Sequence, residues 1–68
     1  MKLHEKSTQR FVKEYCNYKI SWLKDLARQH PEHADEFKGR IVYIERRYKD
    51  WETYIMGVDE AMRLIAEA

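Results

Sequence analysis

Residues 26–37 read LARQHPEHADEF, and this stretch decides the fold because it contains Pro31, the only proline of the 68-residue chain. The residue before a proline avoids the α-helical region, and proline itself is well suited to the first turn of a helix. We therefore expect one helix to end near Gln29, a turn at residues 30–31, and a second helix to begin near Pro31.

After the turn, apolar and aromatic residues recur at alternating steps of three and four, which is the spacing of a heptad seam. The seam stays in phase past Gly39 and Gly57, and neither glycine lies on it. The pattern therefore predicts one continuous amphipathic helix over about residues 31–67. The seam positions are Ala34, Phe37, Ile41, Ile44, Tyr48, Trp51, Ile55, Val58, Met62 and Ile65.

Before the turn, the pattern predicts another amphipathic helix over about residues 7–29, with a broader apolar face. Lys19 falls within this face, where its aliphatic stem can pack while its ammonium group reaches water. Cys16 also falls there and is expected to act as a small buried hydrophobic residue. The apolar positions are Phe11, Val12, Tyr15, Cys16, Trp22, Leu23, Leu26 and Ala27.

A short connection between two long helices predicts an all-α, single-domain protein over residues 1–68, folded as an antiparallel helical hairpin. Opposite charge favours this pairing, because residues 1–30 hold seven Lys and Arg against three Asp and Glu, whereas residues 31–68 hold six against nine. A stripe of apolar and small residues beside the seam is surplus to a hairpin, so we expect a homodimeric four-helix bundle. The predicted dimer or partner interface is Tyr43, Trp51, Tyr54, Gly57, Ala61 and Leu64.

Composition narrows the class of protein. Hydrophobic residues make up 44% of the chain, which favours an ordered core over disorder. Cys16 is the only cysteine, which fits a reducing compartment better than a secreted disulfide scaffold. With no apolar run long enough to cross a bilayer, we expect a cytoplasmic protein that does not associate with membranes.

The residues that could carry chemistry do not form a recognisable site. His30, His33 and Glu36 are spaced three apart, but His30 precedes the proline and a fourth metal ligand would have to be His4. Cys16 lies about four helical turns from the two histidines of the turn, too far for a nucleophile and its base. We therefore expect no metal, no cofactor and no enzymatic activity.

The segment 43–51, YIERRYKDW, interleaves basic and aromatic residues, as single-stranded nucleic acid binding requires. Arg46, Arg47 and Lys49 would be its phosphate contacts. Acidic neighbours at positions 45, 50 and 52 offset them, and the net charge of the whole chain is only +1. Binding of nucleic acid is therefore the alternative function.

The leading hypothesis is a non-enzymatic protein-interaction module. Its helix faces would bind a larger protein, and the chain would act as a small regulator, inhibitor or assembly factor. In size and pattern the chain is similar to small helical regulators and phage-encoded inhibitors, although no motif in it identifies a family.

Overall fold

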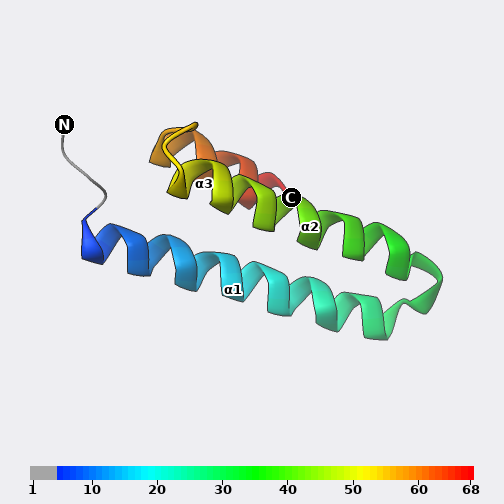
Figure 1. Cartoon of the computed structure of the whole chain (residues 1–68). Helices are drawn as coiled ribbons and strands as arrows, with labels where there is room; N and C mark the ends of the chain where they lie inside the picture. Colours follow the sequence, from blue (N-terminus) through cyan, green and yellow to red (C-terminus); the bar gives the residue numbers. More distant parts are fainter. Residues whose placement is uncertain (1–4) are drawn as a thin grey trace.

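The computed structural model describes residues 5–68 and contains three α-helices that pack together (Figure 1). Helix α1 spans Lys6–Gln29, the short 3-10 helix η1 spans Pro31–His33, α2 spans Ala34–Glu52, and α3 spans Val58–Glu67. No strand occurs among the described residues, so the all-α prediction is confirmed. None of the helices described over residues 5–68 combines the length and the apolar character that a membrane span requires.

The first helix ends where the sequence predicts. His30 has left the helical region, with φ −130° and ψ 71°, and its N–H donates to the carbonyl of Leu26 at 2.8 Å. Pro31 then begins η1, and α1 and α2 lie side by side running in opposite directions (Figure 1). The expected division of the chain at Pro31 is confirmed.

The prediction of one continuous helix over residues 31–67 is wrong. The helix does continue through Gly39, but it ends at Glu52, and α3 begins only at Val58. Ile55, a position of the expected seam, lies in the connection with 76% of its surface exposed.

Helix α2 ends in a hydrogen-bonded cap that the seam does not reveal. Tyr54 adopts the left-handed conformation, with φ 65°, and its N–H donates to the carbonyl of Trp51 at 3.0 Å. The N–H of Ile55 donates to the carbonyl of Asp50 at 2.9 Å. This pair of bonds is the Schellman motif, in which a left-handed residue turns the chain out of the helix. The Thr53 hydroxyl adds a bond to the carbonyl of Lys49 at 2.8 Å.

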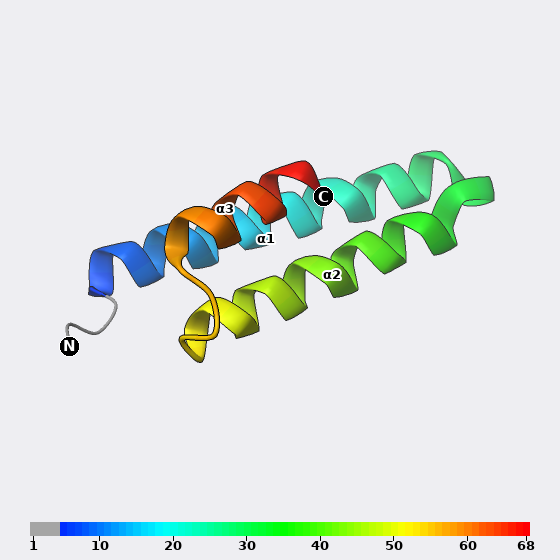
Figure 2. The ribbon, with the colours of Figure 1, turned by 90° about the horizontal axis from the view of Figure 1, so that it is seen from above.

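Gly57 then starts α3 from an extended conformation, with φ −75° and ψ 161°. The acidic residues Asp59 and Glu60 occupy the first turn of α3, where their interaction with the helix dipole is favourable. The helix runs back along α2 and packs against both α1 and α2 (Figure 2). The result is three packed helices instead of the expected two.

The core consists of side chains from all three helices. Helix α3 contributes Ala61 and Ile65, both with no exposed surface, and Trp51 of α2 is the largest fully buried side chain. Because α3 turns back onto α1 and α2, Ala61 is buried within a single chain. The sequence pattern had assigned it to a stripe that would be buried only in a dimer. The buried core residues are Val12, Cys16, Leu23, Ile44, Trp51, Ala61 and Ile65.

Lys19 lies within this apolar interior with only 9% of its surface exposed. Its Nζ donates to the carbonyl of Ala66 at 3.3 Å and lies 4.8 Å from the centre of the Trp22 ring. A cation at the C-terminal end of a helix is favoured by the helix dipole. The ammonium group, expected to reach water, is instead bound to the last turn of α3.

Candidate interaction surfaces

The predicted interface residues do not form one continuous surface. Trp51 and Ala61 are fully buried inside the chain, so they are not accessible to a partner in this fold. Tyr43 and Tyr54 are partly exposed, and Gly57 is exposed in the connection before α3. Leu64 is half-buried on α3. The sequence pattern placed these residues on one helix, whereas they lie on α2, α3 and the turn between them.

In the segment 43–51, the three candidate phosphate contacts differ in their exposure. Arg47 is half-buried; its guanidinium lies 4.8 Å from the centre of the Tyr43 ring and 2.9 Å from a carboxylate oxygen of Asp50. Arg46 and Lys49 are exposed. One of the three cations is therefore already engaged by an aromatic ring and a carboxylate of its own helix.

The histidines lie near single carboxylates. His30 Nδ1 is 3.6 Å from Glu32, and His33 Nδ1 is 3.9 Å from Glu36. The pKa of the Glu32 carboxyl is lowered, first by a backbone hydrogen bond and then by the two imidazoles. Over residues 5–68, no three His, Cys, Asp or Glu side chains are grouped closely enough to hold a metal ion, and His4 lies outside the described residues.

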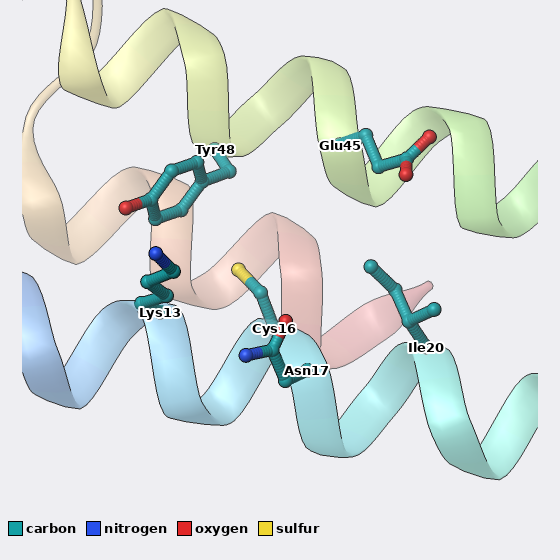
Figure 3. A pocket seen from close by; sticks show the side chains of 6 residues that line it. All are labelled: Lys13, Cys16, Asn17, Ile20, Glu45 and Tyr48. Carbon is teal, nitrogen blue, oxygen red and sulfur yellow. The ribbon is translucent and has the colours of Figure 1, made fainter.

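Cys16 borders a hollow of about 180 Å³ between α1 and α2 (Figure 3). Lys13 and Tyr48 point toward each other at one end of it, with α3 behind the two helices. Burial raises the pKa of the Cys16 thiol to about 11, so the thiol stays protonated at neutral pH. Because the thiolate is the nucleophilic form, this position has no activated nucleophile.

A second hollow, of about 440 Å³, lies between the C-terminal half of α1 and the N-terminal half of α2. We call it the basic groove. Ala27, Ile41 and Val42 form its apolar floor. Its rims carry three cations, Lys24, Arg28 and Lys38.

A further surface is a stripe of aromatic rings along α1, which the sequence pattern did not separate from the broad apolar face that includes Phe11, Tyr15 and Trp22. Phe11, Tyr18 and Trp22 are exposed by 60%, 66% and 45%, and Tyr15 is half-buried. The Tyr15 and Tyr18 rings stack with their centres 6.4 Å apart. These four residues, here called the aromatic stripe, follow steps of four, three and four. The buried residues of α1 have the same spacing one position later, at Val12, Cys16, Lys19 and Leu23. The aromatic stripe could therefore have been recognised in the sequence as a second, parallel seam.

Comparison with known proteins found no match to the chain among family models, curated proteins or solved structures.

Proposed function

We propose that this chain is a protein-interaction module that associates with a second copy of itself through the aromatic stripe. Its remaining helix faces would be presented to a larger protein, which the chain serves as a small regulator, inhibitor or assembly factor. The observation that carries the proposal is the exposure of three large aromatic residues on one face of one helix. Exposed apolar patches of this kind are typical of interaction sites, and aromatic residues are enriched at the centres of interfaces.

The spacing of the aromatic stripe supports a second copy as the occupant. A twofold interface requires that residue i of one copy contacts residue j of the other, and the reverse. Steps of four, three and four read the same in both directions along α1. Antiparallel pairing of two α1 helices would therefore set Phe11 against Trp22 and Tyr15 against Tyr18. The proposed dimer would therefore form through α1 and not through the stripe that included Ala61, which is buried within the chain.

Sedimentation equilibrium over a range of concentrations tests the proposal. We expect the wild-type chain to dimerise with a dissociation constant on the order of 10 μM, typical of a small interface. Tyr18→Glu should weaken dimerisation by about tenfold or more, because it puts a charge into an apolar contact.

Ile55→Glu is the matched control. It introduces the same charge at an apolar residue that is 76% exposed and lies outside the aromatic stripe, so dimerisation should persist. A wild-type chain that stays monomeric at all concentrations, or an equal loss in both variants, would contradict the proposal.

A further inference from the structure

The basic groove combines two properties that a ligand must match. Its floor is apolar, and Val42 on it is 49% exposed. Its rims are cationic, with Lys24 and Arg28 one turn apart on α1 and Lys38 across from them on α2. Arg28 is paired with Asp25, but no carboxylate of residues 5–68 pairs with Lys24 or Lys38. A complementary ligand therefore carries apolar groups at its centre and negative charge on both flanks.

An amphipathic helix with acidic flanks has this arrangement. It can place an apolar stripe on the floor while carboxylates on either side reach the two rims, which is the helix-in-groove mode of recognition. A nucleic acid strand fits less well. Its phosphates could use the cations, but the floor would stay wet, and no aromatic ring lines the basic groove for a base to stack on.

The fold itself contains a precedent for the apolar part of this mode. Helix α3 is an amphipathic helix that lies against the same two helices, with Ala61 and Ile65 buried between them. It is also acidic, with Asp59, Glu60 and Glu67 against a single Arg63. Its last turn lies beside Lys19, in the middle of α1, where the Lys19 ammonium group donates to the carbonyl of Ala66. No residue of α3 lines the basic groove. The α1–α2 pair thus already binds one amphipathic helix through apolar contacts and leaves the basic groove open.

We propose that the basic groove is a docking site for an acidic amphipathic helix of another protein. This site is separate from the aromatic stripe, which lies at different positions around α1 and contributes no residue to the basic groove. Docking therefore does not depend on self-association.

A labelled peptide tests the proposal by fluorescence anisotropy with the full chain. The probe is a helix of about three heptads with Leu at positions a and d and Glu at positions e and g, and a second probe carries Gln at e and g. We expect the Glu probe to bind with a dissociation constant on the order of 10 μM at low salt, and the Gln probe about tenfold more weakly. Raising the salt from about 50 mM to about 500 mM should weaken the Glu probe by about tenfold.

Variants locate the site. Lys24→Glu and Lys38→Glu should each weaken the Glu probe by about fivefold or more, because each reverses a rim charge. Arg46→Glu makes the same change of charge at an exposed cation outside the basic groove and should change the dissociation constant by less than about twofold. Val42→Ser leaves the charge unchanged and should still weaken binding, because it makes the floor polar. Circular dichroism checks that each variant remains helical.

Four outcomes would overturn the proposal. The first is no binding of the Glu probe, and the second is equal weakening by Lys24→Glu and Arg46→Glu. The third is tighter binding of a labelled oligothymidine that is lost in the same rim variants, which would assign the site to nucleic acid. The fourth is dissociation of the self-associated chain by Lys24→Glu, which would show that a second copy occupies the basic groove.

Discussion

Burial decides the chemistry of Cys16. A thiol in the reference state has a pKa of 9.0, and desolvation raises it to about 11 in the folded chain. Its position on the apolar face of α1 was predictable, because the helical spacing places it among core residues. The hollow beside it was not predictable, because it depends on how closely α2 approaches.

The raised pKa of Cys16 makes stability depend on pH. Between about pH 9 and pH 11 the unfolded thiol loses its proton while the folded thiol keeps it, so this residue stabilises the fold below pH 9 and loses that contribution as the pH rises. We expect the stability advantage of the wild type over Cys16→Ala to shrink by about 2 kcal/mol between pH 8 and pH 10.5. Urea unfolding at the two pH values measures it. A constant difference would show that the thiol is not desolvated in solution.

Lys19 marks the limit of inference from a single residue. Its place on an apolar face of α1 predicted a packed stem, and the stem is indeed buried. The partner of its ammonium group lies 47 residues later in the chain, at the carbonyl of Ala66. Helical periodicity describes neighbours within one helix, so it held no information about this bond.

At the scale of whole helices, the end of α2 was the main failure of prediction. The heptad seam remains in phase through residues 53–57, and nothing in its spacing distinguishes a continuous helix from a turn. The break depends on local backbone chemistry: Thr53 hydrogen-bonds back to the helix, Tyr54 takes a left-handed conformation, and Gly57 is extended. By contrast, Pro31 acts through covalent geometry, which is why the first turn was predictable.

The left-handed backbone of Tyr54 leads to a prediction about stability. A residue with a β-carbon pays about 1 kcal/mol or more in this conformation, and glycine does not. Tyr54→Gly should therefore be more stable than Tyr54→Ala by about 1 kcal/mol, because both variants lose the ring but only alanine retains the strain. Thermal and urea unfolding of the two variants gives the difference. Alanine as the more stable variant would argue that the helix continues through this position.

For the molecule as a whole, the all-α class followed from periodicity, but the arrangement of the helices did not. Trp51 and Ala61 were predicted at an interface between chains, and both are buried within one chain. Apolar residues at heptad positions need a neighbouring helix, and the sequence does not say whether that helix belongs to a second copy or to the same chain. Here the neighbouring helix belongs to the same chain, because the turn at residues 53–57 brings α3 back against α1 and α2.

The aromatic stripe was hidden for a related reason. Two seams lie side by side on α1, one beginning at Val12 and the other at Phe11, and periodicity merged them into one broad face. Only the position of α2 and α3 separates the buried seam from the exposed one. A sequence with adjacent seams on one helix therefore predicts more apolar surface than its own core can cover.

The shortness of α3 has a consequence for motion. A helix of ten residues is too short to persist alone in water, so α3 is helical because it is docked. If it detaches, it unfolds, and this can occur while α1 and α2 stay paired. Such an event is a local opening with a smaller free energy than global unfolding.

Native-state hydrogen exchange should resolve this hierarchy. We expect the amides of α3 to exchange about tenfold faster or more than those in the middle of α1, once each is corrected for its intrinsic rate. Lys19→Met keeps the aliphatic stem but removes the bond to Ala66, so it should speed exchange in α3 more than in α1. Equal protection of the two helices would mean that all three open as one cooperative unit. Unequal protection would mean that the chain exists partly as a two-helix state, a minor species that the hydrogen bond from Lys19 to Ala66 disfavours.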